Sequence, residues 1–334
     1  MATPTPELFA SPTPAISVIL PVLNEEKHLE HAVQSILSQD YLGPIEVILA
    51  IGPSHDRTRE IAEAISKRES RVVLVDNPTG RTAAGLNLAL KKSQNPVIVR
   101  VDGHAQIPNS YLSLVVEILK KTGAVNVGGV MAAIGVTPFE KAVAGAMRSP
   151  LGVGASRFHT GGEAGVVDTV YLGAFRREAL LEIGGFDERF TRAQDWELNF
   201  RLRENGGVVY FDPRLHVTYR PRSSIKALAK QYFEYGRWRR VVSRRHIGTI
   251  NYRYLAPPVA LVGFLASLIA GFFTPILFLP AAIYLFFVLI ASVKIASSLR
   301  EYFLLLAVIP TMHFAWGAGF ISSPKNLVPL DEKN

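Results

Sequence analysis

The chain has 334 residues, of which 49% are hydrophobic and 19% are charged. An ordinary soluble domain carries about 25% charged residues, so this composition, with a mean hydropathy of +0.21, excludes a disordered chain and favours a membrane-associated protein. The chain contains no cysteine, which excludes a disulfide scaffold, a zinc–thiolate or iron–sulfur site and a thiol nucleophile.

Residues 1–14 are rich in Pro, Thr and Ala and predict a short disordered leader, because they lack the basic start and apolar core of a signal peptide. From residue 15 onward, short apolar runs alternate with helical patterns, which predicts an α/β domain over residues 15–213 built from parallel βαβ units. The expected strands are 16–22, 45–51, 71–75 and 96–101, and the expected helices are 26–39, 56–67 and 82–92. Ligands of such sheets bind at the carboxyl ends of the strands.

Polar residues follow the first and the fourth expected strands at those ends. Asn24 and Glu25 follow the first strand, and the triplet Asp102-Gly-His104 follows the fourth. Neither sequence is a glycine-rich phosphate loop, so a bound nucleotide diphosphate would need a hard divalent cation to neutralise its charge. Asp102 and His104 could present both side chains to one such ion, and a capped turn is the alternative interpretation.

A second group of polar residues lies near position 190. Gly184 and Gly185 break a helix, and Phe186 is placed to enter an apolar wall. Asp195 begins a new helix that is expected to end at Asn205. A carboxylate at a helix N-terminus stays ionised, unless burial or a nearby diphosphate restores its basicity. Simple N-capping is the alternative role for Asp195.

A basic segment, residues 214–253, holds eleven Lys and Arg residues and a single acid, Glu234. It is followed by forty residues, Tyr254–Val293, without a charged side chain or a histidine. As one helix these would measure about 60 Å, twice the hydrocarbon core of a bilayer. Aromatic residues interleave with the arginines of residues 231–240, which also fits single-stranded nucleic acid. The adjoining apolar segment favours an amphipathic helix with membrane lipids as partners, and no nucleic acid.

The apolar region, residues 254–322, predicts about three transmembrane helices. Thr274-Pro275 permits a turn in the first run, and the last run holds His313 as its one titratable group. The expected helices are about 255–273, 276–293 and 302–322. Two spans with an interfacial or re-entrant segment remain the alternative.

Basic loops determine the expected orientation. The basic segment, and the connection that carries Lys294 and Arg300, are expected in the cytoplasm. With three spans the tail, residues 323–334, would then end outside. We therefore expect a multi-pass protein of the cell inner (plasma) membrane, with the α/β domain in the cytoplasm.

Five motifs in this order resemble the family 2 glycosyltransferases, which are inverting, metal-dependent enzymes of GT-A fold. The resemblance covers roughly Ala15 to Arg240. The motifs are Pro21…Asn24-Glu25, Ser54-His-Asp56-x-Thr58, Asp102-x-His104, Gly184-Gly-Phe-Asp187 and Gln194-Asp-Trp196. The Asp-Gly-His variant and the three apolar segments, together with Gly173-Ala-Phe175 and Tyr235-Gly-Arg-Trp238, are most similar to the succinoglycan-type subgroup.

The resemblance implies a role for each matching residue. Asp195 would be the general base, and Asp102 and His104 would hold Mn²⁺ or Mg²⁺. The residues implied to border the nucleotide sugar are Pro21, Asn24, Glu25, Asp56 and Asp102. Arg81 is added to them because its side chain could reach the diphosphate. A surface position without contact to the donor is equally expected for Arg81. The residues implied in the acceptor region are Gly173, Gly185, Phe186, Asp187, Trp196, Arg237 and Trp238.

The implied function is transfer of one sugar from a nucleotide sugar to a hydroxyl of a polyprenyl-diphosphate-linked saccharide, in surface or exopolysaccharide biosynthesis. Ile51-Gly-Pro53 replaces the acidic residue with which the family commonly reads the base, so a UDP-sugar is only weakly favoured as donor. Gln231 lies too far from Arg237-Trp238 for the Gln-x-x-Arg-Trp motif of processive synthases. The alternatives are a polyprenyl-phosphate glycosyl synthase and an inactive membrane-bound scaffold of GT-A fold.

Overall fold

The computed structural model describes residues 11–250 and 252–328, so part of the expected leader and of the expected tail lies outside the described residues. The described chain divides into two compact units. The first unit comprises Met1–Ala132 and Gly161–Thr218, and the second comprises Ala133–Thr160 and Tyr219–Asn334. The second unit thus takes a segment from the middle of the expected α/β domain.

The first unit is built on an eight-stranded mixed sheet with the strand order β3-β2-β1-β4-β7-β5-β8-β6. Its parallel half consists of β1 (Ile16–Val22), β2 (Ile45–Ile51), β3 (Val72–Asp76) and β4 (Val97–Arg100). The other half consists of β5 (Asn126–Ala133), β6 (Gly165–Val166), β7 (Tyr171–Arg176) and β8 (Val209–Tyr219). β7 is antiparallel to both β4 and β5, and β6 is antiparallel to β8.

The parallel strands confirm the predicted βαβ units, and the first two begin and end at the predicted residues. The antiparallel half was not predicted, although residues 208–211 have the apolar pattern of a strand. For β5 and β7 glycine explains this failure, because it lowers the strand propensity of both. A Cβ on Gly129 of β5 would lie 1.6 Å from the carbonyl oxygen of Leu215, so close contact with β8 requires glycine there.

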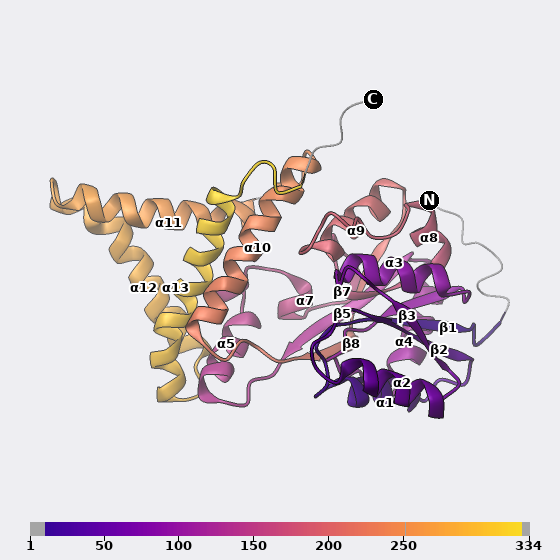
Figure 1. The fold of residues 1–334 in the computed structure, drawn as a ribbon. Coiled ribbons are helices and arrows are strands. Elements are labelled where there is room, and N and C mark those ends of the chain that lie inside the picture. The colour runs from indigo at the N-terminus through magenta and orange to yellow at the C-terminus, as the bar shows by residue number, and fades with distance from the viewer. Residues whose placement is uncertain (1–10, 251, 329–334) are drawn as a thin grey trace. The chain divides into compact units, whose positions relative to one another are not determined.

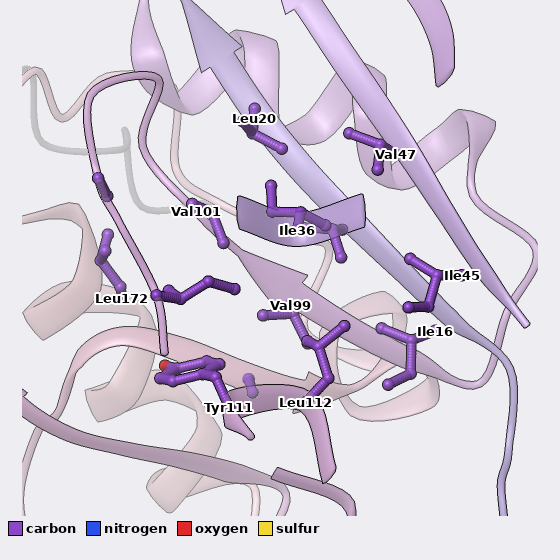
Figure 2. Packing of buried hydrophobic residues seen from close by; sticks show 14 of the residues in the cluster. Ile16, Leu20, Ile36, Ile45, Val47, Val99, Val101, Tyr111, Leu112 and Leu172 are labelled. Atoms are coloured by element: carbon purple, nitrogen blue, oxygen red, sulfur yellow. The ribbon is translucent and has the colours of Figure 1, made fainter. Parts of the chain in front are cut away.

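Helices cover both faces of this sheet (Figure 1). They are α1 (Leu29–Leu37), α2 (Thr58–Arg68), α3 (Thr82–Lys92), α4 (Tyr111–Thr122), α8 (Arg177–Glu182) and α9 (Gln194–Glu204). Successive strand residues enter opposite cores, as the two-residue period of a strand requires. Leu20 and Val47 pack on one face with residues of α1 and α4, as Figure 2 shows. Ile19 and Ile48 pack on the other face with residues of α3, α8 and α9.

The second unit is helical. Its shorter helices are α5 (Pro138–Met147), α6 (Pro150–Val153) and α7 (Arg157–Thr160). Its longer helices are α10 (Ile225–Arg245), α11 (Tyr252–Gly271), α12 (Leu279–Ile295), which follows the 3-10 helix η2 (Pro275–Phe278), and α13 (Leu299–Ser322). By length and composition, α11, η2 with α12, and α13 could each cross a membrane. The three predicted apolar helices are therefore confirmed.

α10 and α13 pack side by side through glycines (Figure 1). A Cβ on Gly236 of α10 would lie 1.9 Å from the carbonyl oxygen of Trp316, and a Cβ on Gly319 of α13 would lie 1.9 Å from that of Phe233. Small residues at both positions allow the two backbones to approach, as in the tight helix pairs of membrane proteins.

We predict that Gly236→Ala lowers the free energy of unfolding of the second unit by about 1–3 kcal/mol, because the added methyl group overpacks against backbone that has little room to move. Gly263→Ala in α11 is the matched control, since its Cβ would meet no atom within 4 Å. Better helix propensity should leave this control unchanged or more stable by up to about 1 kcal/mol. Thermal unfolding in detergent measures both, and equal transition temperatures would contradict the glycine contact.

Candidate active site

A buried arginine joins the two carboxylates that were predicted to carry the chemistry. Arg100 is the last residue of β4, and 7% of its side chain is exposed. Its Nη2 and Nε donate to Oδ1 of Asp102 at 3.0 and 3.2 Å. Its Nη1 donates to Oδ1 of Asp195, which lies 95 residues further along the chain. The end of β4 and the first turn of α9 therefore meet at one guanidinium group.

Arg100 was not identified from the sequence, although a signal was present. It stands in a short strand whose other members, Val97, Ile98 and Val99, are apolar and fully buried. Arginine is almost never buried unless it is paired, so a cation in such a strand predicts acidic partners. Asp102, two residues further along the chain, would have been the first acidic partner to consider for Arg100.

The surroundings of Asp195 suit a proton acceptor. Burial raises the pKa of Asp195, and the charge of Asp102 raises it further, while the charge and hydrogen bond of Arg100 oppose the increase. Burial acts to lower the pKa of Arg100, but the two carboxylates outweigh it, so the pKa of Arg100 is raised and the group stays protonated. Asp195 thus takes up a proton more readily than an exposed aspartate does.

Asp195 does not cap α9. The N-cap residue is Ala193, which has a φ of 59° and makes no side-chain capping bond. The side chain of Asp195 points instead to Arg100. The structure therefore excludes the alternative of simple N-capping and leaves the carboxylate near the positive end of the helix dipole.

Asn24 lies in the loop after β1 and connects it to the loop after β2. Asn24 has a φ of 57°, a left-handed conformation that asparagine tolerates better than most residues. Its backbone N–H donates to Oγ of Ser54 at 3.1 Å, and its Oδ1 accepts from the backbone N–H of His55 at 2.9 Å. Pro21 lies in the neighbouring strand β1, opposite Ala50. Asn24 therefore fixes the shape of the loop pair.

Asp56 stabilises the same loops. Its Oδ1 accepts from the backbone N–H of Thr58 at 3.0 Å at the start of α2, and its Oδ2 accepts from that of Glu26 at 3.2 Å. The hydrogen bond from the Thr58 hydroxyl, helped by these backbone N–H groups, lowers the pKa of Asp56. The hydroxyl of Thr58 also accepts from the backbone N–H of Glu25 at 2.7 Å. The sequence pattern Ser54-His-Asp56-x-Thr58 thus connects the loop after β2 to the loop after β1.

Asp102 can act as a metal ligand in this arrangement. Its Oδ1 accepts both bonds from Arg100, and its Oδ2 has no hydrogen-bond partner among the described residues. The Nδ1 of His104 lies 2.7 Å from Oε1 of Glu25, so these two predicted site residues contact each other. Within the described chain, no three His, Cys, Asp or Glu side chains form a metal-binding group. Mg²⁺ and similar ions often take one carboxylate and complete their shell with phosphate and water, and Asp102 fits that use.

The loop Gly184–Asp187 is held by Asn87 of α3. Asn87 Nδ2 donates to the carbonyl oxygen of Phe186 at 2.8 Å, and its Oδ1 accepts from the backbone N–H of Phe186 at 2.8 Å. Gly185 has a φ of 73°, and a Cβ there would lie 2.6 Å from Oδ1 of Asn87. The Phe186 ring enters the core, as predicted, and meets Phe175 edge to face at 6.2 Å.

The other residues predicted for the donor and the acceptor occupy varied positions. Arg81 is exposed at the N-cap of α3. Asp187 accepts from Nη2 of Arg189 at 2.8 Å, and Trp196 stacks on Phe200 with ring centroids 6.1 Å apart. Gly173 lies inside β7, where a Cβ would be 2.3 Å from Oδ1 of Asn126, so the strand requires glycine there.

Arg237 and Trp238 belong to the second unit, on α10. Nη1 of Arg237 donates to Oε1 of Glu234 at 3.3 Å, and Nε1 of Trp238 donates to Oε2 of the same carboxylate at 3.2 Å. This carboxylate is the single acid of the basic segment. The structure therefore brings Asp102 and Asp195 together, and it links Glu25 to His104, while a role for the other predicted residues in binding stays a prediction.

A mixed sheet with paired carboxylates at the end of its parallel half is the architecture of a GT-A glycosyltransferase. The chain matches the family model "Glycosyl transferase family 2" over residues 17–184, and it belongs to that family. The succinoglycan biosynthesis protein ExoA of Rhizobium meliloti is 32% identical over 310 residues, which cover 91% of this chain and 93% of that relative.

More distant proteins share the architecture. An enzyme of Methanococcus voltae is 25% identical over 86% of this chain and 89% of its own length. It is named dolichyl N-acetyl-α-D-glucosaminyl phosphate 3-β-D-2,3-diacetamido-2,3-dideoxy-β-D-glucuronosyltransferase. The mannosyltransferase PcManGT of Pyrobaculum calidifontis, solved with GDP-Man and Mn²⁺, has a TM-score of 0.63 and 21% identity over 92% of this chain and 86% of its own. S. aureus TarS with UDP-GlcNAc has a TM-score of 0.51 and 18% identity over 90% of this chain and 89% of its own. These structures show the fold.

We predict that activity falls on the acidic side as Asp195 is protonated, at a pH above the usual aspartate range because its pKa is raised. Arg100→Met removes the cation that opposes this increase, so the acidic limb should move upward by about one to three pH units. Arg100→Lys is the matched control, since it keeps the charge and loses the forked hydrogen bonds. A pH–rate profile measures the shift, and an unmoved limb in Arg100→Met would contradict the coupling.

We also predict that Asn87→Ala lowers the free energy of unfolding by about 2–3 kcal/mol, because it leaves the backbone N–H and carbonyl of buried Phe186 without partners. Asn205→Ala is the control, since its bond to Glu182 is long, at 3.3 Å, and exposed. That change should stay within about 0.5 kcal/mol. Urea unfolding compares the two variants, and equal losses would refute the role of Asn87.

Proposed function

We propose that this glycosyltransferase moves one sugar from a nucleotide sugar to a hydroxyl group of a lipid-linked saccharide, with inversion at the anomeric carbon, in exopolysaccharide biosynthesis. The contact between Arg100, Asp102 and Asp195 carries the proposal, because a carboxylate of raised pKa lies beside a carboxylate whose Oδ2 accepts no hydrogen bond from the described part of the chain. The similarity to the succinoglycan biosynthesis protein of Rhizobium meliloti supports the pathway.

In this proposal Asp195 accepts the proton of the acceptor hydroxyl while the oxygen attacks the anomeric carbon. An alcohol is a poor nucleophile until a base takes its proton, and positioned bases contribute about 10²–10⁴-fold in rate. The new C–O bond forms as the bond to the diphosphate breaks, so a single displacement inverts the centre. Mn²⁺ or Mg²⁺ held by Asp102 would neutralise the charge that gathers on the departing diphosphate. Arg100 keeps the two carboxylates in place.

A membrane-bound acceptor fits the rest of the chain. The name of the Methanococcus voltae relative describes transfer to a dolichyl-phosphate-linked sugar. The apolar helices and the basic segment would keep the enzyme at the surface where such an acceptor resides, which raises its effective concentration. We place the catalytic unit on the cytoplasmic side of the inner membrane, because Lys and Arg residues mark the cytoplasmic side.

A polyprenyl-phosphate glycosyl synthase is the alternative enzyme. Its acceptor is a phosphate that is already ionised, so it needs no general base. The raised pKa of Asp195 favours an acceptor whose proton must be removed. An inactive scaffold is the other alternative, and it would have no reason to keep a buried arginine with two acidic partners at the end of β4.

We predict that the purified protein with Mn²⁺ and a crude bacterial lipid extract releases nucleoside diphosphate from one member of a panel of nucleotide sugars. Asp195→Asn should lower turnover by about 10²–10⁴-fold with the donor still bound. Asp102→Ala should abolish the part of the activity that EDTA removes. Asp40→Asn, an exposed aspartate of another loop, is the matched control and should leave turnover unchanged.

The outcomes separate the alternatives. Release by the unchanged chain and by Asp40→Asn, but not by Asp195→Asn, supports a hydroxyl acceptor. Full activity in Asp195→Asn would favour the lipid-phosphate acceptor. The absence of release and of donor binding with every nucleotide sugar would refute the enzyme and leave the scaffold.

A further inference from the structure

Three strongly exposed apolar side chains of the second unit lie together at the turn between α11 and α12. Phe272 and Phe273 are 83% and 85% exposed, and Ile276 beside them is 68% exposed. The turn is hydrogen-bonded within itself, because Oγ of Ser267 donates to the carbonyl oxygen of Leu277 at 2.6 Å and accepts from the backbone N–H of Ala281 at 3.1 Å. α11, η2 and α12 thus form a hairpin whose turn is hydrogen-bonded by Ser267 and whose tip is apolar. Such a tip needs hydrocarbon around it.

α13 has different surroundings, because one charged helix, α10, packs along it in addition to α11 and α12. α10 lies along it from the contact of Gly236 with Trp316 to the bonds of Arg244, which donates to the carbonyl oxygens of Ser323 and Pro324. α5 also packs on α13. The charged residues of α10 occur along its whole length: Lys226, Lys230, Glu234, Arg237, Arg239, Arg240, Arg244 and Arg245. A helix of this kind is not stable in hydrocarbon, so the helix that it covers cannot be centred there.

The ends of the three apolar helices do not alternate as three crossings require. If each crossed, the start of α11 and the end of α13 would lie on opposite faces of the bilayer, about 30 Å apart. Instead Tyr254, at the start of α11, stacks on Trp316 near the end of α13, with ring centroids 6.4 Å apart. A Cβ on Gly317 would lie 2.7 Å from the carbonyl oxygen of Pro257. Figure 1 shows α11 starting beside the C-terminal end of α13 and α12 returning toward its N-terminal end.

We propose that the chain enters the membrane only by the hairpin of α11 and α12, whose tip stays inside the bilayer, while α13 lies along the interface. α11 has 20 residues and is about 30 Å long, and Tyr254 and Phe264 hold it against α13, so its tip stops short of the far surface. The end of α13 then lies on the same side as the catalytic unit. The hydrocarbon of the bilayer is the partner of the tip.

The positions of three basic residues are consistent with a chain that enters and leaves the membrane on one side. Arg244, Arg245 and Lys325 line a cavity of about 260 Å³ together with Val241 and Val328. The cavity joins the end of α10 to the residues after α13, so both belong to one side of the membrane. Clusters of Lys and Arg mark the side with anionic headgroups, and a cavity lined by three cations and two valines suits such a headgroup. The tail, which three crossings would place outside, is then inside.

Because the chain has no cysteine, single cysteines report accessibility without a background. We would introduce Asn326→Cys after α13, Thr274→Cys at the hairpin tip and Ser70→Cys in the catalytic unit, three positions that are exposed. A membrane-impermeant maleimide would be applied to intact spheroplasts and to inside-out vesicles of the full-length protein. The cysteine-free chain is the blank, and Ser322→Cys is the second probe should Asn326→Cys fail to accumulate in membranes.

We expect Asn326→Cys to be labelled only in the preparation that labels Ser70→Cys, and Thr274→Cys to be labelled in neither until detergent is added. Labelling of Asn326→Cys from the side opposite to Ser70→Cys would overturn the proposal, because it would require α13 to cross. Labelling of Thr274→Cys from that opposite side would overturn the re-entrant hairpin, because the tip would then have emerged.

Discussion

The geometry of the candidate active site depends on one buried cation, Arg100. A guanidinium group that is removed from water must recover its lost solvation from acidic partners, and Arg100 has two of them, Asp102 and Asp195. The same contact lets two carboxylates lie close together without their full mutual repulsion. Since Arg100 ends β4 and Asp195 lies in the first turn of α9, this electrostatic requirement also positions the helix against the sheet edge. The guanidinium group of Arg100 therefore stabilises the contact between β4 and α9 and also holds the two carboxylates of the candidate site.

Much of the fold could be predicted, because buried parallel strands are continuous apolar runs that end at polar turns. Ile16–Val22 and Ile45–Ile51 have these features, and both were predicted to the residue. β5 and β7 could not be predicted, because their glycines meet neighbouring backbone or side chains, as at Gly129 and Gly173. Strand propensity penalises these glycines, whereas the close approach that requires them is visible only in three dimensions.

The candidate site was predictable in its residue types and less so in their contacts. Asp102 and Asp195 follow from spacing and from the resemblance, but a motif does not state which side chain a carboxylate faces. Asn24 and Asp56 illustrate the difference. The family pattern alone assigns both residues to the nucleotide, whereas in the structure their hydrogen bonds connect two loops. Asn87, which holds the loop of Phe186, had no sequence signal, since a helical asparagine predicts nothing about a distant backbone.

Hydropathy measures the residues that a helix contains and not the neighbours that pack on it. α13 and α11 of the hairpin are similar in hydropathy, but α10 packs on α13. Gly236 and Gly319 bring α10 so close to α13 that protein, rather than lipid, occupies that face of an apolar helix. In the proposed arrangement the same glycines let a charged helix and an apolar helix form one pair at the interface, where Lys and Arg side chains would extend toward headgroups and apolar residues would face the bilayer. An acceptor lipid that diffuses in the plane of the membrane would then meet this pair at the depth of its own headgroup. Attachment by a hairpin would need no segment of the chain to cross to the far face.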